Sequence, residues 1–307
     1  MPDAPVLVTG GTGQLARALG AAPDGLDIRL VGRPVFDFDR PATLAACLAE
    51  IRPALVVNAA AYTAVDRAES EPDAAARANR DGPAELSRLC AAAGIPLIHV
   101  STDYVFDGAK GAPYVEVDPT SPTGVYGTTK RDGEAAVLAG CRQAIVLRTS
   151  WVYAPTGKNF VLTMVNAARR TGAAPARLRV VGDQRGCPTA AGDLARAITT
   201  IARRILADGF DPAWAGVHHA AGVGETTWHG LAAAVFEHSR ELGVTPPVID
   251  AIATADWPTP ARRPADSRLD CGKLFATFGV RLPEWREALD RVVATIAAAP
   301  VGGSPVG

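Results

Sequence analysis

A glycine-rich segment follows the first apolar run of this chain and limits the folds that are open to it. The run APVLVTG ends in glycines at Gly10, Gly11 and Gly13, after which a helical pattern begins. Glycine permits a tight turn and lets backbone N–H groups approach a pyrophosphate at the start of a helix. Ala16 stands where a third glycine is common and mainly serves helix–strand packing. A glycine-rich turn after the first strand therefore predicts a dinucleotide-binding fold.

The rest of the N-terminal half alternates short apolar runs with helical patterns. The runs are LDIRLVG, PALVVNAA, IPLIHVST and QAIVLRTS, and one helical pattern between them, GPAELSRLCAAAG, ends at Gly94. Strands that alternate with helices of this length predict βαβ units and hence a parallel sheet covered on both faces. The predicted fold class is α/β, a Rossmann-type doubly wound parallel sheet.

The regularity weakens beyond residue 151, where proline, glycine and arginine become denser. The segments LRVVGDQRGCPT and TPARRPADSRLD are predicted to be loops of a smaller lobe. We predict a dinucleotide-binding domain over residues 1–150, to which later segments can return, a mainly substrate-binding lobe over 151–298, and a flexible tail over 299–307.

Charge and hydropathy argue against several classes of partner. The 307 residues carry a net charge of −1, and 48% of them are apolar, so a large core can form. Basic residues are scattered, which argues against nucleic acid or an anionic membrane as a partner. No run of about 18 apolar residues appears, and MPDAPVLVTGG lacks the basic start of a secretory signal. We expect a cytoplasmic protein.

The cysteines and histidines show no pattern typical of a metal site. The five cysteines are widely spaced without a CxxC, so they are expected to be reduced thiols. His218 and His219 lie in the apolar run GVHHAAG, a predicted buried strand in which adjacent side chains point to opposite faces. We predict no metal ligands there.

The end of the second predicted strand bears on the choice of dinucleotide. An acidic residue at this position would bind a ribose 2′-hydroxyl and repel a 2′-phosphate. The run LDIRLVGRP instead ends in Gly32 and Arg33, so we expect one cation and no acid within reach of the ribose. This predicts NADPH as the cofactor, with NADH possible.

A tyrosine and a lysine four residues apart, Tyr126 and Lys130, lie in PTGVYGTTKRDGE. The chain uses 27 arginines but only four lysines, so a lysine here suggests a task that a compact ammonium does better than a guanidinium. Residues i and i+4 share one helix face. The ammonium is expected to lower the phenol pKa, and the phenol to protonate a carbonyl oxygen as hydride reaches the carbon.

A third polar group is expected at the carboxyl end of a neighbouring strand, where open α/β sheets bind ligands. The run IPLIHVSTDYVFDG places Ser101, Thr102 and Asp103 at such an end. The Thr102 hydroxyl is predicted to bind the substrate carbonyl and to orient Tyr126. By strand alternation, Ser101 should point away from Thr102.

These segments together resemble the extended short-chain dehydrogenase/reductase family, and within it the reductases of dTDP-linked sugars. The matching stretches are VTGGTGQLARAL, VVNAAAYTAVDRAESEPDAAARAN, HVSTDYVFDG, PTGVYGTTKRDGE, LRTSWVYAPTGKNF, VVGDQRGCPT and RRPADSRLD. They cover most of the chain in order. The resemblance implies NADPH-dependent reduction of the 4-keto group of dTDP-4-dehydro-6-deoxy-L-mannose to dTDP-L-rhamnose.

The resemblance also implies roles for individual residues. The catalytic set would be Thr102, Tyr126 and Lys130. Cofactor contacts would come from the glycine-rich turn, the segment after the second strand, the segment after the third and the catalytic pair: Gly10, Thr12, Gly13, Gln14, Leu15, Arg33, Asp37, Phe38, Ala61, Tyr62, Thr63, Tyr126 and Lys130. Substrate contacts would come from Thr102, Asp103, Trp151, Asn159, Arg185 and Arg263, with the arginines gripping the diphosphate.

Two departures and several rivals stay open. Ala18 stands where some members of the family carry a glutamate for an interfacial magnesium ion, so no metal is expected. Tyr104 stands where a sugar-nucleotide 4,6-dehydratase would need a glutamate base, and a 4-epimerase would have a serine-rich segment here. A non-catalytic NADP-binding subunit and a sibling 4-ketoreductase of another dTDP-deoxysugar, such as a dihydrostreptose-type substrate, are alternatives. A monomer and a homodimer are equally consistent with the sequence.

Overall fold

The computed structural model describes residues 4–22, 25–170 and 177–299. Most of the predicted tail, residues 300–307, lies outside them. Six strands form one sheet in which all neighbours are parallel. In chain order they are β1 (Val6–Thr9), β2 (Ile28–Val31), β3 (Leu55–Asn58), β4 (Leu97–Thr102), β5 (Ala144–Thr149) and β10 (Gly216–His219). All six correspond to apolar runs predicted as strands, and the α/β fold class is confirmed.

The order of strands across the sheet creates a point at which the chain reverses direction. The order is β10-β5-β4-β3-β1-β2, so β1 lies between β2 and β3. The chain moves one way from β1 to β2 and then the other way through β3, β4, β5 and β10. Doubly wound sheets bind ligands outside the carboxyl ends of the strands at this switch point. Here the ends of β1 and β3 are joined by a buried 2.6 Å hydrogen bond from the Thr9 hydroxyl to Asn58 Oδ1.

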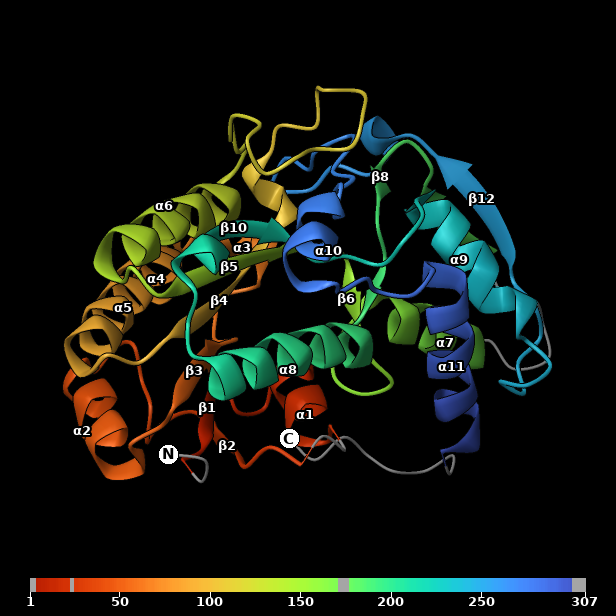
Figure 1. Ribbon diagram of the computed structural model, residues 1–307. Coiled ribbons are helices and arrows are strands. Elements are labelled where there is room, and N and C mark those ends of the chain that lie inside the picture. The colour runs from red at the N-terminus through yellow and green to blue at the C-terminus, as the bar shows by residue number, and fades with distance from the viewer. Residues whose placement is uncertain (1–3, 23–24, 171–176, 300–307) are drawn as a thin grey trace.

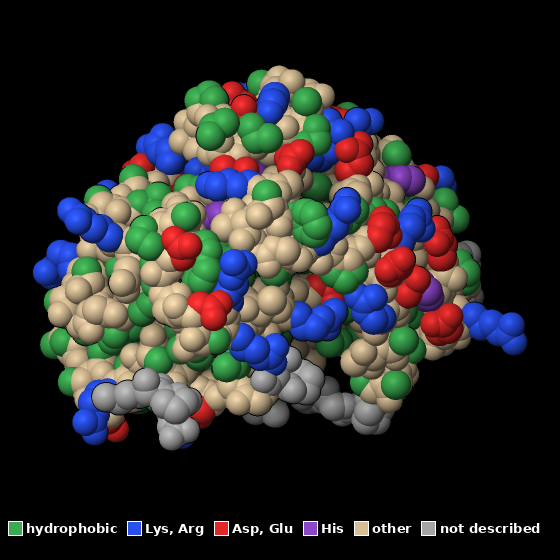
Figure 2. All heavy atoms as spheres, in the orientation of Figure 1, with side chains coloured by type: hydrophobic (Ala, Val, Ile, Leu, Met, Phe, Trp, Pro, Cys, Tyr) green, Lys and Arg blue, Asp and Glu red, His purple; other side chains and the backbone are tan. Residues whose placement is uncertain are grey.

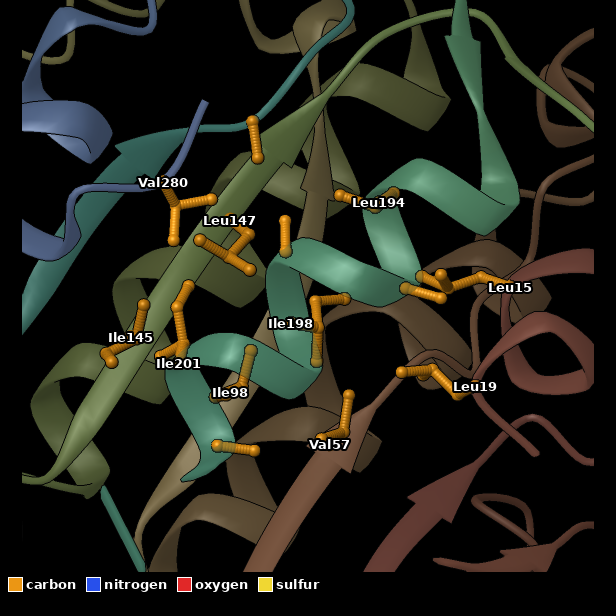
Figure 3. Close-up of a cluster of buried hydrophobic side chains, with 14 of the residues drawn as sticks. Leu15, Leu19, Val57, Ile98, Ile145, Leu147, Leu194, Ile198, Ile201 and Val280 are labelled. Atoms are coloured by element: carbon orange, nitrogen blue, oxygen red, sulfur yellow. The ribbon is translucent and has the colours of Figure 1, made fainter. Parts of the chain in front are cut away.

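Helices cover both faces of the sheet, as the alternating pattern predicts (Figure 1). The helices α1 (Gln14–Gly20), α8 (Ala191–Asp208) and α10 (Gly272–Phe278) pack on one face. The helices α2 (Ala42–Ile51), α5 (Gly82–Ala93) and α6 (Val125–Gly140) pack on the other. Neighbouring strand residues divide between the faces, so Val57 faces α8 whereas Val56 faces α2 and α5. Figure 3 shows Leu15 and Leu19 of α1 beside Ile198 of α8 in the hydrophobic core on the α8 face of the sheet.

A further hydrophobic core lies beside the sheet and forms most of the smaller lobe. It consists mainly of α7 (Phe160–Arg170), α9 (Trp228–Glu237) and α11 (Trp285–Ala298), which Figure 1 shows grouped to the right of the sheet. Two parallel strands, β7 (Arg177–Val181) and β12 (Val248–Ile252), pair at its edge. The prediction that the LRVVGDQRGCPT segment is all loop was therefore wrong, because β7 pairs with a strand some 70 residues later in the chain, Arg177 with Val248. The boundary proposed at residue 150 stays a prediction.

Short elements connect these layers. They are the helices α3 (Val65–Ala68) and α4 (Pro72–Ala76), a π-helical turn at Arg77–Asp81, 3₁₀ turns at Asp103–Val105, Pro212–Trp214 and Thr254–Asp256, and the strands β6 (Val152–Tyr153), β8 (Arg185–Gly186), β9 (Thr189–Ala190) and β11 (Thr226–Thr227). Within the described ranges no helix is long and apolar enough to cross a membrane. On the face shown in Figure 2, basic and acidic side chains are interspersed rather than gathered by sign.

Candidate active site

A cavity of about 1040 Å³ lies at the carboxyl ends of the sheet strands, where the chain order reverses. Its wall includes Gly10 after β1, Ala59 after β3, Thr102 at the end of β4 and Thr149 at the end of β5. Fifteen of the residues predicted for the site line it: Gly10, Thr12, Gly13, Gln14, Leu15, Arg33, Phe38, Ala61, Tyr62, Thr63, Thr102, Asp103, Tyr126, Lys130 and Trp151. The structure thus brings together the residues of six separate sequence segments.

The glycine-rich turn forms one end of the cavity. Gly10 has a φ of 87°, and a Cβ atom there would lie 2.8 Å from the carbonyl oxygen of Ala59. Only glycine therefore fits at this position without strain. Gly13 is the N-cap of α1, with no side-chain cap and no acidic residue in the first turn of Gln14–Gly20. The N–H groups at the start of α1 are left available to an anion on the cavity side.

The end of β2 is less simple than the sequence predicts. Arg33 lines the cavity, but its guanidinium contacts Asp37 Oδ1 at 3.0 Å and Asp39 Oδ2 at 2.8 Å. Arg77 also contacts Asp39, at 2.9 Å, and its hydrogen bond is the main cause that lowers the Asp39 pKa. The expectation of one cation with no acid in reach was wrong, because the loop after β2 turns two carboxylates back onto Arg33. Asp37 itself does not line the cavity.

The segment after β3 is held in place by groups behind the cavity wall. Asn79 is fully buried and bonds both the N–H and the C=O of Tyr62, at 2.8 and 3.1 Å. The same amide donates to the Thr129 hydroxyl on α6 at 3.2 Å. The Tyr62 phenol donates to Glu71 at 2.5 Å. Ala61, Tyr62 and Thr63 therefore meet the cavity on a backbone that is fixed relative to α6.

Tyr126 and Lys130 project into the cavity from the first two turns of α6, as their spacing predicts. Glu69 accepts a 2.8 Å hydrogen bond from the N–H of Val125, the first residue of α6. The helix dipole also stabilises a carboxylate at this end of a helix. The Lys130 ammonium is 2% exposed and donates to the carbonyl of Val100 at 2.7 Å. The helix that carries the pair is thus tied to β4 and to the segment after β3.

Burial, rather than the neighbouring ammonium, dominates the titration of both groups. It raises the pKa of Tyr126 to about 12, although a hydrogen bond with the Thr102 side chain lowers it in part. Burial also lowers the pKa of Lys130 to about 8, although the nearby Glu134 carboxylate raises this pKa in part. The expectation that Lys130 lowers the Tyr126 pKa does not hold in this structure, because the loss of hydration of the phenolate is the larger effect. At neutral pH, Tyr126 is a protonated phenol and therefore a proton donor.

Thr102 and Asp103 form the polar floor at the end of β4. The Thr102 hydroxyl donates to Asp103 Oδ1 at 3.1 Å, and the Ser150 hydroxyl donates to Asp103 Oδ2 at 3.1 Å. Asp103 is 2% exposed, and burial raises its pKa to about 6 despite hydrogen bonds from Ser267, Thr102 and Ser150. Ser101 instead donates to Glu134 on α6. The two neighbouring hydroxyls thus have different partners.

A buried ion pair lies directly behind this floor. Arg148 on β5 binds both carboxylate oxygens of Glu134, with the shortest contact at 2.7 Å, and both side chains are about 5% exposed or less. Glu134 follows Tyr126 and Lys130 on α6 at the same spacing of four residues. The pair joins α6 to β5, and through Ser101 to β4.

The cavity wall also includes residues that were not predicted to line it, and some of them come from the smaller lobe. Trp228, at the start of α9, stacks on Trp151 with ring centroids 3.5 Å apart and 5° between their planes. Lys158 brings a cation to the cavity, and Tyr104 packs edge-on against the Tyr126 ring at 5.7 Å. Thr149 lines the cavity as well, and its buried hydroxyl has no hydrogen-bond partner among the described residues. Nothing in the spacing of the sequence links these residues to the Tyr126 segment.

Three residues predicted to bind substrate lie off the cavity wall because other partners occupy them. Asn159 caps α7, accepting from Leu162 N–H, and its amide donates to Gln14 on α1 at 2.8 Å. Arg185 is 57% exposed and extends toward Glu225 at 3.7 Å. Arg263 binds both oxygens of Asp66, at 3.1 and 2.9 Å. Their roles in binding stay predictions. Among the described residues no group of three or more His, Cys, Asp or Glu is arranged to hold a metal ion.

The fold and this cavity define a dinucleotide-binding α/β protein with a tyrosine–lysine pair at the sheet's switch point. The chain belongs to the family described as the RmlD substrate binding domain, whose family model matches residues 4–298. A dTDP-4-dehydrorhamnose reductase of Sinorhizobium fredii is 47% identical over 287 residues, 93% of this chain and 95% of that relative. A Streptomyces antibioticus protein named "Probable dTDP-4,6-dihydroxy-2-methyloxan-3-one 4-ketoreductase" is 43% identical over 95% of this chain and 96% of its own.

Solved structures agree with this assignment. The crystal structure of a dTDP-4-dehydrorhamnose reductase of Bacillus anthracis in complex with NADP has a TM-score of 0.86 at 29% identity. The match covers 94% of this chain and 98% of that one. The resemblance to the extended short-chain dehydrogenase/reductase family, predicted from the sequence, is thereby confirmed.

Proposed function

We propose that this protein is an NADPH-dependent reductase of the 4-keto group of dTDP-4-dehydro-6-deoxy-L-mannose and forms dTDP-L-rhamnose. The observation that carries the proposal is that Thr102, Tyr126 and Lys130 line one cavity together with the glycine-rich turn. The names of the relatives and the NADP of the Bacillus anthracis structure support it.

The residues at one end of the cavity suit a dinucleotide. Gly10 makes a tight turn packed against the backbone of Ala59, and the start of α1 has neither a side-chain cap nor an acid. Both features suit a diphosphate. Gly13, Gln14 and Leu15 would hold the diphosphate, Arg33 and Phe38 the adenosine end, and Tyr62 and Lys130 the nicotinamide end. When bound, NADPH supplies the hydride that reduces the carbonyl carbon.

The chain's own residues supply the proton and the orientation. Tyr126, whose pKa burial raises to about 12, carries its proton at neutral pH and donates it to the carbonyl oxygen as negative charge develops there. The Thr102 hydroxyl binds the same oxygen and holds it near the phenol. The Lys130 ammonium, fixed by the Val100 carbonyl, stabilises the phenolate that remains.

Other residues of the cavity wall would bind the rest of the substrate. Asp103 would contact sugar hydroxyls, and Trp151 would pack against the deoxyhexose ring. Lys158, which lines the cavity, adds a cation that a diphosphate can contact. We propose that the protein acts in the cytoplasm as a monomer or homodimer. All five cysteines are free thiols, four of them buried, which suits a reducing compartment.

The test is the consumption of NADPH with dTDP-4-dehydro-6-deoxy-L-mannose, with the product identified by NMR and NADH assayed in parallel. Oxidation of NADPH with dTDP-L-rhamnose as product is expected. Binding of NADPH without turnover of this substrate would contradict the proposed reaction and favour the non-catalytic alternative.

A sibling 4-ketoreductase is the second candidate. It is favoured by the 43% identity to the Streptomyces antibioticus protein, whose name gives a different dTDP-sugar substrate. A panel of dTDP-4-keto sugars in the same assay separates the two. The candidate would replace the main proposal if another sugar, such as a dihydrostreptose-type precursor, had a kcat/KM at least tenfold higher.

A further inference from the structure

The segment from Val180 to Gly186 contacts the aromatic wall of the cavity through Gln184 and Gly186. Trp151, at the centre of this wall, has a backbone φ of 46°. A bulky residue other than glycine seldom adopts this left-handed conformation, which persists only where surrounding structure enforces it. The groups that enforce it are therefore candidates for a functional role.

Two residues confine the Trp151 indole from opposite sides. Trp228 stacks on one face with centroids 3.5 Å apart, closer than the 4.5–7 Å of most aromatic pairs. On another side, a Cβ atom at Gly186 would lie 2.3 Å from Cε2 of the Trp151 ring. The absence of a side chain at Gly186 leaves room for the Trp151 indole, and the stacked Trp228 ring restricts its movement on the other side.

Trp228 is in turn anchored by a chain of hydrogen bonds. Its Nε1 donates to Gln184 Oε1 at 3.1 Å, and Gln184 Nε2 donates to the Thr254 hydroxyl at 3.1 Å. Asp183 accepts from that hydroxyl at 2.6 Å. Gln184 is 4% exposed. Phe160 of α7 packs against Trp228 with centroids 4.8 Å apart. The Trp228 ring, which packs against Trp151, is thus held by a hydrogen bond at Nε1 and by Phe160 along one side.

We propose that Trp228, anchored by Gln184, is a positioning residue that fixes Trp151 against the sugar moiety of the substrate. The inference rests on the proposed function. An indole held before binding loses no side-chain freedom when the ligand arrives, so it contributes more to affinity than a mobile one. The ligand that suits this wall is a deoxyhexose, whose ring C–H groups and methyl group are apolar.

The test compares steady-state kinetics of three variants with the wild type. Trp228→Ala should raise the KM for the dTDP-sugar about tenfold, the worth of a close aromatic pair, while the KM for NADPH changes less than about twofold. Trp228→Phe keeps a ring on Trp151 and should restore most of the affinity. Gly186→Ala intrudes on the other side of the indole and should reproduce the Trp228→Ala result, which covers the case in which Trp228→Ala fails to fold.

Circular dichroism supplies a readout that a general loss of stability would not imitate. The stacked indoles should give a paired positive and negative far-ultraviolet band, which both Trp228 variants should lose while remaining folded. Trp257→Phe is the matched control, because this tryptophan is 52% exposed and does not line the cavity. It should retain the paired band and the wild-type KM values.

The outcomes distinguish a failure of the proposed role of Trp228 from a failure of the proposed function. An unchanged sugar KM in folded Trp228→Ala and Gly186→Ala, with an active wild type, would overturn the inference alone. Equal rises in the KM for NADPH and for the sugar would also overturn it. A wild type that does not oxidise NADPH with any dTDP-4-keto sugar would overturn the proposed function and the inference together.

Discussion

At the dinucleotide end of the cavity the chain presents mainly backbone, whereas at the reaction end it presents buried polar side chains. Gly10 and Gly13 form the first end, and the charged groups near it, such as Arg33, are exposed and paired. The reaction end holds Asp103, Tyr126 and Lys130, each with a pKa displaced by burial. Binding a common cofactor needs shape and hydrogen-bond donors. Catalysis of proton transfer needs groups whose pKa values differ from those in water.

This difference predicts where substitutions act. At the reaction end, the loss of one atom should reduce turnover strongly and leave cofactor binding intact. At the dinucleotide end, a substitution should act through steric fit or through the balance of surface charge, with smaller effects. The predictions below test this division, starting with the largest expected effect.

Tyr126→Phe removes only the phenol oxygen and with it the proton donor. We expect kcat to fall by roughly 10²–10⁴-fold with little change in NADPH affinity, because a positioned acid contributes about this much. Steady-state kinetics and fluorescence titration of NADPH measure the two effects. Tyr114→Phe is the matched control, since that buried phenol donates to Asp107 at 2.8 Å away from the cavity wall. Turnover of Tyr126→Phe close to that of Tyr114→Phe would exclude Tyr126 as the acid.

Asp103→Asn should stabilise the protein at neutral pH while lowering its activity. The pKa of Asp103 is raised from 3.8 to about 6, so the folded state binds more protons than the unfolded state between these values. Stability therefore falls as pH rises through this window, by at most roughly 3 kcal/mol. The neutral amide of the Asp103→Asn variant would avoid this loss of stability, because no charge is buried. Unfolding free energies should favour the variant at pH 7.5 and converge with the wild type below pH 3.8.

The control for this effect is a carboxylate with the opposite shift. Lys110 lowers the pKa of Asp118, so Asp118→Asn should give no gain at pH 7.5. If Asp103→Asn were no more stable than the wild type at pH 7.5, then the hydrogen bonds from Ser150 and Thr102 would fully offset the cost of burial. The two ends of the cavity would then be energetically alike.

Much of this arrangement could be predicted from the sequence, because it depends on local patterns. The six sheet strands follow from apolar runs, and the Gly10 turn follows from a backbone that only glycine can adopt. The shared face of Tyr126 and Lys130 follows from helix geometry. These features need no knowledge of contacts between distant residues.

The features that could not be predicted depend on such contacts. Trp151 and Trp228 are far apart in sequence, and nothing local indicates that they stack. The raised pKa of Tyr126 follows from how deeply α6 packs against the sheet, which no spacing reveals. Arg33 was predicted as a lone cation because the turn that brings Asp39 back to it follows a glycine–arginine–proline sequence with no helix or strand pattern.

Gly10→Ala tests the backbone-built end. A φ of 87° disfavours alanine by roughly 1–2 kcal/mol, and the new Cβ would also lie 2.8 Å from Ala59 O. We expect lower thermal stability and a KM for NADPH raised about tenfold or more. Gly94→Ala is the matched control, because its φ is 66° with nothing within 4 Å of the added atom. It should lose stability alone. Equal KM values in the two variants would show that the turn at Gly10 does not shape the dinucleotide site.

Asp39→Asn should give the smallest effect and bears on cofactor choice. The Asp39 carboxylate binds both Arg33 and Arg77, so it competes with a 2′-phosphate for their charge. Because all three side chains are substantially exposed, the gain is limited to the worth of a surface ion pair, up to about 1 kcal/mol or roughly fivefold. The ratio of kcat/KM for NADPH to that for NADH should rise by about this factor.

Salt dependence and a second variant sharpen this last prediction. The rise in the ratio should shrink as ionic strength increases, since exposed charges are screened. Asp27→Asn removes an equivalent exposed partner, that of Arg29 at 2.8 Å, away from the cavity wall, and should leave the ratio unchanged. If Asp39→Asn also left it unchanged, Arg33 would not contact the 2′-phosphate. Cofactor preference would then have to arise from backbone and shape alone, and the contrast between the two ends of the cavity would be sharper still.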